Sequence, residues 1–247
     1  MNNLVSVIMP TYNSSKTLFA SVQSVLSQIY TDWELLIVDD CSSDNTWNLI
    51  QELADSDSRI KVFQNESNLG AGGSRNKAIE QAKGRYIAFL DSDDKWCEHK
   101  LEKQITFMKE NKVAFSYTGY QKFNSEGLQG KVIPPEFATY KKLLVSNYIG
   151  CLTVIYDKFI LGKHYMPLIR KRQDFGLWLK LLKQCGNAQG IPEILAYYSV
   201  DTGMTQNKFN ILKWQWIFYR NELNLSFIKT AYIFPIYAYK GIFKSLK

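Results

Sequence analysis

The sequence is poor in cysteine, proline and glycine, with 4, 6 and 14 of these residues among 247. Such counts exclude a disulfide scaffold and a collagen-like repeat. The four cysteines, Cys41, Cys97, Cys151 and Cys185, are scattered and form no Cys-x-x-Cys pair. This spacing favours four reduced thiols in a cytoplasmic protein.

Long apolar runs are also missing, since no stretch approaches the roughly 20 apolar residues that cross a bilayer as a helix. The nearest run, Thr230 to Tyr239, is bounded by Lys229 and Lys240 and is far too short. The N-terminus lacks the basic and apolar regions of a secretory signal. We therefore expect a cytoplasmic protein without a membrane span.

Acidic residues become scarce toward the C-terminus, although the whole chain carries a formal net charge of only +7. Residues 1–100 contain 9 basic and 14 acidic side chains, whereas residues 205–247 contain 7 basic side chains and the single acid Glu222. This last segment is also rich in tryptophan and tyrosine. An acidic front suits a cation, and a basic aromatic tail suits an anionic membrane or a nucleic acid.

Hydrophobic residues make up 46% of the chain, which excludes disorder as its dominant state and allows a sizeable core. Apolar runs and helical spacing alternate along the first half of the chain. Strands are predicted at residues 5–9, 33–38, 60–64, 86–90 and 113–117, and helices at residues 17–28, 46–54, 71–82 and 98–109. This alternation predicts an α/β fold with a parallel sheet covered on both faces.

The pattern loosens after residue 118. A loop or hairpin is predicted at residues 124–136, strands at 151–156 and 191–200, and a helix at 174–185. Two further helices are predicted within residues 205–245, joined near Asn224, Leu225 and Ser226. We therefore divide the chain into a catalytic domain, residues 1–204, and a basic aromatic helical extension, residues 205–247.

Polar groups follow three of the predicted strands, at the edge where open α/β sheets bind ligands. They include five carboxylates, those of Asp39, Asp40, Asp91, Asp93 and Asp94. Unpaired carboxylates that converge on one edge repel each other and resist burial, and a divalent cation would resolve this conflict. Hard oxygen ligands without clustered histidine or cysteine predict Mg²⁺ or Mn²⁺ rather than zinc.

Two further segments suit anionic groups. Residues 68–76 form a glycine-rich approach to a helix N-terminus, where backbone N–H groups suit an anion and Arg75 suits a phosphate or a base edge. This segment is neither a P-loop nor a true Gly-x-Gly-x-x-Gly motif. Residues 170–172 are three consecutive cations that can neutralise a diphosphate, and Asp174, two positions further on, can serve as a general base.

Each of these elements also has a purely structural interpretation. The turn at residues 91–93 can be solvated, Asp39 and Asp40 can cap a helix, and residues 170–172 can form an exposed basic turn. The order and placement of all the elements together favour a functional site over these separate interpretations.

Four segments stand in a fixed order, namely VSVIMPTYN (5–13), ELLIVDDCSSDNT (34–46), NLGAGGSRNKA (68–78) and GRYIAFLDSDD (84–94). Together they resemble glycosyltransferase family 2. The resemblance implies the GT-A fold, in which a Rossmann-like nucleotide-binding sheet merges with an acceptor-binding half, and an inverting transferase with a nucleotide-sugar donor. The C-terminal part resembles short bacterial members that build surface polysaccharides such as O-antigens, capsules or teichuronic acid.

The resemblance also implies roles for individual positions. The residues implied in donor binding are Pro10, Thr11, Tyr12, Asp39, Asp40, Arg75, Asp91, Arg170 and Arg172. Among them, Asp40 or alternatively Asp39 contacts the base, usually uracil, which favours a UDP-sugar. Asp93 is the principal ligand of Mg²⁺ or Mn²⁺, with Asp91 as a candidate second ligand.

Asp174 matches the aspartate of the family's Glu-Asp motif, which implies that it is the general base, and Gln173 stands where the glutamate is usual. This departure keeps the implied base and weakens any role for a second carboxylate. The Gln-x-x-Arg-Trp motif of the processive synthases is missing, and so are their membrane spans. We therefore expect one sugar to be added per acceptor.

The basic aromatic tail suggests where the acceptor is met. Lysine and arginine are attracted to anionic lipid, and tryptophan and tyrosine favour the headgroup zone. Residues 205–247 are therefore predicted to dock on the inner face of the plasma membrane, where a polyprenyl-diphosphate-linked saccharide acceptor would be. The alternative is a helical pair packed on the domain, with lysines that are merely solvated.

Other classes of protein explain fewer of these features. A sugar nucleotidyltransferase would need a glycine-rich basic loop directly after the first strand, and residues 10–13 do not supply one. A nucleic-acid-binding module would explain the tail but not the carboxylates, so we expect no nucleic-acid partner. An inactive relative that binds a donor without transfer has Gln173 as its only support.

Overall fold

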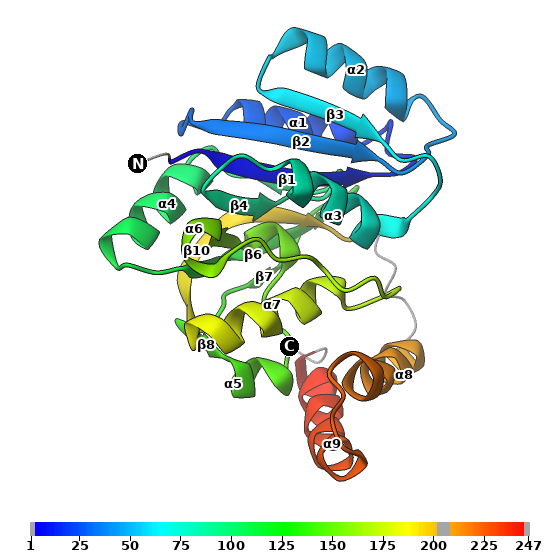
Figure 1. The fold of residues 1–247 in the computed structure, drawn as a ribbon, viewed down its shortest axis with the longest axis vertical. Helices are drawn as coiled ribbons and strands as arrows, with labels where there is room; N and C mark the ends of the chain where they lie inside the picture. The colour runs from blue at the N-terminus through cyan, green and yellow to red at the C-terminus, as the bar shows by residue number, and fades with distance from the viewer. Residues whose placement is uncertain (1–2, 202–207, 245–247) are drawn as a thin grey trace.

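A single mixed β-sheet forms the centre of the computed structural model, which describes residues 3–201 and 208–244 (Figure 1). In this part of the chain ten strands join the sheet, and eight of them follow the order β3-β2-β1-β4-β9-β6-β10-β5. β7 pairs with β6, and β8 pairs with β10. The strands are β1 (Val5–Thr11), β2 (Trp33–Asp39), β3 (Ile60–Gln64), β4 (Tyr86–Phe89), β5 (Lys95–Trp96), β6 (Phe115–Asn124), β7 (Gly127–Val132), β8 (Phe137–Thr139), β9 (Ile155–Asp157) and β10 (Asn187–Ser199).

The first half of the sheet is built from repeated strand–helix–strand units. Strands β1 to β4 run parallel to one another, and every residue of β1 and β2 is buried, as expected for strands covered on both faces. The connecting helices are α1 (Leu18–Leu26), α2 (Thr46–Ser56), α3 (Gly70–Gln81) and α4 (Lys100–Glu110). The strands and helices predicted up to residue 109 are thus confirmed, with small shifts at their ends.

The second half corrects the prediction of a purely parallel sheet. β9 lies antiparallel between β4 and β6, with Ile155 opposite Ala88 on one side and opposite Ser116 on the other. β9 therefore separates β6 from the parallel strands β1 to β4, although β10 runs parallel to β6. Local periodicity indicates which faces of a strand are buried, but it does not specify which strand lies alongside.

The strand predicted at residues 151–156 is wrong in its first half. Cys151–Thr153 form a 3₁₀ turn, because both the backbone N–H and the hydroxyl of Thr153 donate to the carbonyl of Gly150, at 3.0 and 2.7 Å. Threonine side chains often favour such local turns over a strand. The hairpin predicted at residues 124–136 is confirmed by β6 and β7.

Helices cover both faces of the sheet, as predicted. The helices α3, α5 (Tyr140–Leu144), α6 (Lys158–Leu161) and α7 (Gln173–Cys185) pack on one face. There Trp178 is fully buried, and its ring lies against those of Phe89 and Phe115. The helices α1, α2 and α4 pack on the other face.

The C-terminal helices α8 (Lys208–Ile217) and α9 (Phe227–Lys244) lie together at the lower end of the molecule in Figure 1, joined by a π-helical turn (Phe218–Glu222). Their predicted junction near residue 225 is confirmed. Tyr219 belongs to the same core as α7, and its hydroxyl donates to the carbonyl of Leu144. The predicted domain boundary at residues 204 and 205 lies outside the described residues. Across residues 3–201 and 208–244, no helix has the length and apolarity needed to cross a bilayer.

Lys100, the first residue of α4, is fully buried. Its Nζ donates to Oε1 of Gln104 at 2.5 Å and lies 4.9 Å from the ring centre of Trp96. Burial lowers the pKa of Lys100 from 10.5 to about 7. Because the folded-state pKa lies below the unfolded one, the unfolded chain binds more protons between these values, and Lys100 makes stability rise with pH from about 7 to 10.

Replacing Lys100 by methionine is therefore expected to flatten the pH dependence of stability. Between pH 7 and 10 the slope of the free energy of unfolding against pH should fall by up to about 1.4 kcal/mol per pH unit. This is the slope expected when the unfolded chain binds one more proton than the folded chain. Urea unfolding at several pH values measures this slope. Lys180→Met, an exposed position on α7, is the matched control. An unchanged slope in Lys100→Met would contradict a neutral buried amine.

Candidate active site

Two neighbouring cavities open at the carboxyl ends of the parallel strands, where open α/β sheets bind ligands. The larger has a volume of about 920 Å³ and includes Asp174 in its lining. The smaller has a volume of about 580 Å³ and includes Pro10, Thr11, Tyr12, Asp40 and Asp93, among others. Ala71, Arg75 and Asp91 line both cavities. The structure thus brings most of the predicted site residues together, in two adjoining spaces.

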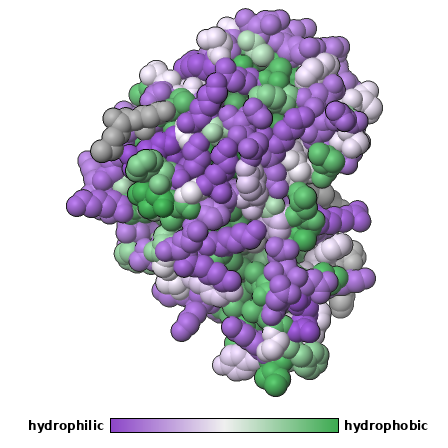
Figure 2. Space-filling model, viewed as in Figure 1, coloured by the Kyte–Doolittle hydropathy of each residue, from purple (hydrophilic) through white to green (hydrophobic). Residues whose placement is uncertain are grey.

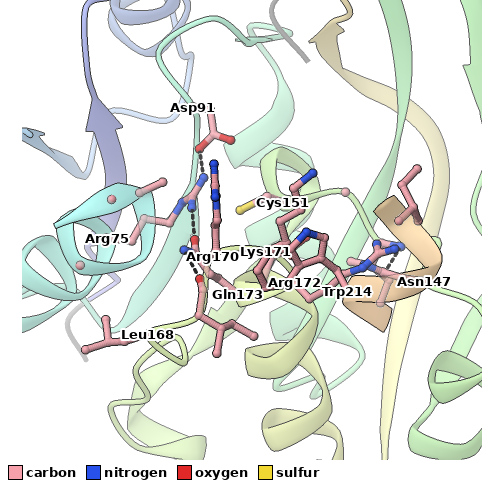
Figure 3. A pocket seen from close by; sticks show the side chains of 18 of the residues that line it. Arg75, Asp91, Asn147, Cys151, Leu168, Arg170, Lys171, Arg172, Gln173 and Trp214 are labelled. Carbon is pink, nitrogen blue, oxygen red and sulfur yellow. Dashed lines mark hydrogen bonds and ion pairs between the residues drawn. The ribbon is translucent and has the colours of Figure 1, made fainter. Parts of the chain in front are cut away.

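Arg75 stands at the junction of the two cavities. It projects from α3, is 8% exposed, and its Nη2 lies 2.5 Å from Oδ1 of Asp91 (Figure 3). Burial acts to lower the pKa of Arg75, but the neighbouring Asp91 carboxylate raises it, so the guanidinium stays charged. Nη1 donates to Oε1 of Gln173 at 3.3 Å, and Gln173 Nε2 donates to the carbonyl of Ile169 at 2.7 Å.

Gln173 therefore links the side chain of Arg75 to the backbone carbonyl of Ile169, a different role from that of an acidic side chain. It accepts a hydrogen bond from Arg75 and donates one to a backbone carbonyl, and an ionised glutamate could only accept. The Gln173 side chain also packs closely on α3, because a Cβ on Gly72 would come to 2.8 Å from it. The departure from the family pattern at this position thus has a structural reason in this chain.

Asp174 lies in the first turn of α7 and lines the larger cavity. Burial raises the pKa of its carboxyl above the usual value. The backbone N–H of Phe175 and the positive charges of Arg75 and Arg172 oppose that rise, and the Asp91 charge adds to it. A carboxylate with a raised pKa is a better proton acceptor, which is the property a general base needs.

Asp39 and Asp40 follow β2 but lie in different surroundings. Asp39 is fully buried, accepts from the side chains of Ser42 and Gln64, and is outside the lining of both cavities. Asp40 borders the smaller cavity, and its Oδ1 and Oδ2 accept the backbone N–H groups of Leu69 and Gly70, at 2.8 and 2.7 Å.

This contact identifies an anion that the glycine-rich segment at residues 68–76 holds within the fold. The start of α3 does attract an anion, as a helix N-terminus should, but the anion is the carboxylate of Asp40. Asn65 adds a third hydrogen bond to the same carboxylate, at 2.7 Å from Oδ1. The Asp40 charge is therefore balanced by backbone dipoles within the fold.

The three carboxylates of the turn after β4 have different surroundings. Asp94 is buried and accepts the backbone N–H of Ser199 at 2.8 Å, and burial together with Asp91 and Asp93 raises its pKa well above the usual range. Asp91 faces Arg75, and Asp93 lines the smaller cavity. Five converging carboxylates were predicted, but among the described residues no three acidic, histidine or cysteine side chains form a metal-binding group. Asp39, Asp40 and Asp94 accept hydrogen bonds from backbone N–H groups, and Asp91 forms an ion pair with Arg75.

The three consecutive cations at residues 170–172 line the larger cavity, not the smaller one that holds residues 10–12. Arg172 adopts a left-handed backbone conformation, with φ of 71°, at the start of α7. Its guanidinium carbon lies 5.7 Å from the ring centre of Tyr237 on α9. The C-terminal helices therefore contact the loop that precedes Asp174.

Several cavity residues were not singled out from the sequence. Tyr120, Tyr148, Cys151, Tyr198 and Trp214 all line the larger cavity. They come from four separate parts of the chain, and no local motif marks them. Trp214 belongs to the basic aromatic tail, and its position in the cavity depends on how α8 packs.

The central sheet of the chain matches that of solved proteins with the GT-A fold. The chain superposes on Staphylococcus aureus TarS 1–349 in complex with UDP-GlcNAc with a TM-score of 0.71, at 24% identity, over 88% of this chain and 66% of that one. A mannosyltransferase from Pyrobaculum calidifontis in complex with GDP-Man and Mn²⁺ gives a TM-score of 0.63 at 15% identity, over 86% of this chain and 59% of that one. These similarities confirm the predicted fold.

The sequence comparisons then give the family. Residues 6–163 match the family model described as glycosyl transferase family 2, and the chain belongs to this family. It is 46% identical to the putative teichuronic acid biosynthesis glycosyltransferase TuaG of Bacillus subtilis, over 98% of both chains. It is also 46% identical to the Escherichia coli glucosyltransferase WfgD, over 86% of this chain and 84% of that one. The rival classes, a nucleotidyltransferase and a nucleic-acid-binding module, find no support in these relatives.

Proposed function

We propose that this glycosyltransferase moves one sugar, with inversion, from a UDP-sugar to a polyprenyl-diphosphate-linked saccharide during assembly of a bacterial surface polysaccharide. The main support is the meeting of two cavities at Arg75 and Asp91, with Asp93 bordering one and Asp174 the other. The relatives support the same reaction class. WfgD is named a UDP-Glc:α-D-GlcNAc-diphosphoundecaprenol β-1,3-glucosyltransferase, and TuaG a putative enzyme of teichuronic acid biosynthesis.

The donor nucleotide is assigned to the smaller cavity. Pro10, Thr11 and Tyr12 form one wall, and Tyr12 is half exposed, so its ring is available to a base. Asp40 is the better candidate for the base contact, because it borders this cavity and Asp39 does not. Bound UDP or UDP-GlcNAc in structures of TarS supports a uridine nucleotide.

In the proposed reaction Asp174 accepts the proton of an acceptor hydroxyl. The oxygen then attacks the anomeric carbon in line with the departing nucleoside diphosphate, and the configuration at that carbon inverts. Arg75 is held between Asp91 and Gln173 at the junction of the cavities, where negative charge on a leaving phosphate would develop. A fixed cation at that point stabilises the transition state without reorganisation.

The carboxylates that line the smaller cavity also fit a divalent metal. The lining of the smaller cavity holds four carboxylates against two cations, and all the candidate ligands are hard oxygens. Mg²⁺ is commonly bound by one or two carboxylates, several waters and the phosphates of the substrate. Asp93, with Asp91 beside it, would hold Mg²⁺ or Mn²⁺, and the ion would neutralise charge on the donor diphosphate.

A donor screen tests the proposed function. UDP-, GDP- and dTDP-sugars are offered with N-acetylglucosamine linked through a diphosphate to a lipid, and released nucleotide and glycosylated product are measured. Transfer from one UDP-sugar with inverted configuration is expected. Products extended by many sugars, transfer only from GDP-sugars, or formation of a nucleotide sugar from a sugar phosphate would contradict the proposal.

We also propose that α9 docks on an anionic membrane surface, at the inner face of the plasma membrane. Thr230 and Ile233 face the protein, while Ile228 and Tyr232, which are 82% and 74% exposed, lie on the outer side of the same helix. Hydrophobic residues gather at the lower tip of the molecule, over the start of α9 (Figure 2). An amphipathic helix of this kind binds a membrane interface through its outer apolar face.

Replacing Ile228 and Tyr232 by aspartate is expected to abolish binding to vesicles that contain anionic lipid, because two charges enter the apolar face. Flotation of the full chain with such vesicles measures this binding. Leu128→Asp on β7 is the control, since Leu128 is 70% exposed but far from α9 in the sequence. Equal flotation of the wild type and the double variant would overturn this docking face.

A further inference from the structure

A short basic segment runs along the larger cavity just before α7. We call residues 168–172 the basic strap, and all five of them line this cavity. Two hydrogen bonds hold Ile169 of the strap in place. The N–H of Ile169 donates to the carbonyl of Pro167 at 2.9 Å, and the carbonyl of Ile169 accepts a hydrogen bond from Gln173 Nε2 at 2.7 Å. Its cations are thus held next to the candidate base Asp174.

The two cavities differ in the sign of their charge. The larger is lined by four cations and two carboxylates, and the smaller by two cations and four carboxylates. A diphosphate entering the smaller cavity needs an added cation to offset repulsion. A diphosphate entering the larger cavity meets cationic side chains directly, and Arg and Lys form strong charge-assisted hydrogen bonds with phosphate oxygens.

The cations of the basic strap differ in their surroundings. Arg172 contacts the ring of Tyr237 on α9, and its backbone carbonyl accepts the N–H of Gly176 at 2.9 Å. It therefore fixes the start of α7 against the C-terminal helix. Arg170 and Lys171 precede Arg172 in the basic strap and also line the larger cavity.

We propose that Arg170 and Lys171 bind the diphosphate of the acceptor rather than that of the donor, and that they do so without a metal. This inference rests on the proposed function. The acceptor sugar then lies between the basic strap and Asp174, with Trp214 of α8 as an aromatic surface beside it. Leu168, which is 76% exposed, offers an apolar contact for the start of the lipid.

The test compares two acceptors that carry the same sugar. One is N-acetylglucosamine linked through a diphosphate to a short alkyl chain, and the other is the neutral alkyl glycoside. The double variant Arg170→Gln/Lys171→Gln is expected to raise the KM for the diphosphate acceptor about 10- to 100-fold, as loss of charged hydrogen bonds should. The loss in kcat/KM should be about tenfold or more greater for the diphosphate acceptor than for the neutral glycoside, and the KM for the UDP-sugar should rise less than the KM for the diphosphate acceptor.

Lys180→Gln, an exposed change on α7 outside both cavities, is the matched control. An equal loss with both acceptors, or a rise confined to the KM for the UDP-sugar, would overturn the proposal. Titration calorimetry of the diphosphate compound with EDTA present tests the subsite separately from transfer. Binding by the wild type that is lost in the double variant supports the inference even if no donor sugar is transferred, whereas equal binding by both proteins refutes it.

Discussion

Asp174→Asn is expected to reduce sugar transfer by about 10²- to 10⁴-fold, the usual contribution of a general base. The amide is similar in size to the carboxylate but cannot accept the proton of the attacking hydroxyl. Donor binding should be almost unchanged, because Asp174 lines the larger cavity and the donor is assigned to the smaller one. Steady-state rates and calorimetric titration of the UDP-sugar measure the two effects.

The pH profile gives a second readout for Asp174. Burial raises the pKa of its carboxyl, so the ionised, active form is lost on acidification at a higher pH than for an ordinary aspartate. The wild-type kcat/KM should therefore fall on the acid side, and this limb should be missing from the residual activity of Asp174→Asn. An unaltered acid limb would assign the titration to another group.

The stability of Asp174→Asn shows whether a loss of activity comes from the missing base or from a damaged fold. A raised folded-state pKa means that the ionised carboxylate costs stability at neutral pH, and the cost grows as pH rises through the pKa. Asp174→Asn should therefore be at least as stable as the wild type at pH 7. Asp55→Asn, an exposed change on α2, controls for the amide substitution itself. Full transfer activity in Asp174→Asn would refute its role as the base.

Asp93→Asn is expected to remove the effect of divalent metal on donor binding. The smaller cavity is rich in carboxylates, so the donor diphosphate should bind about 10²-fold more tightly with Mg²⁺ or Mn²⁺ than with EDTA in the wild type. Without the Asp93 charge the two conditions should give nearly the same affinity. Titration of the UDP-sugar in both buffers measures this difference.

The outcome for Asp93 can contradict the assignment in two ways. Equal donor affinity with and without EDTA in the wild type would show that the donor needs no metal. If metal still tightened donor binding fully in Asp93→Asn, another carboxylate would be the metal ligand. Asp91→Asn would then be measured in the same way. Asp55→Asn again serves as the control, and thermal unfolding of each variant checks that the fold is intact.

Much of the first half of the fold follows from local sequence. The run from Trp33 to Asp39 is apolar along most of its length, and a strand buried on both faces is the simplest structure that hides it. The same reasoning gives the other parallel strands and the helices between them. It also marks the strand ends as the place for chemistry, and Asp93 and Arg75 do border a cavity there.

Local sequence could not give the partners of these groups. Asp40 reaches the N-terminus of α3 across some thirty positions of sequence, and this contact decides that its charge is balanced within the fold. The antiparallel place of β9 between β4 and β6 likewise depends on where a later segment returns to the sheet. Periodicity reports the burial of each segment but not its neighbours.

By itself, then, the sequence determined the alternation of strands and helices, the glycosyltransferase motifs and the charge imbalance along the chain. The tertiary structure alone decided how the candidate site is divided, because it separates the carboxylates of the smaller cavity from the cations of the basic strap. It also carries Trp214 from the C-terminal segment into the larger cavity. Residues far apart in sequence meet only when the packed sheet and helices fix their positions, and that packing is cooperative rather than local.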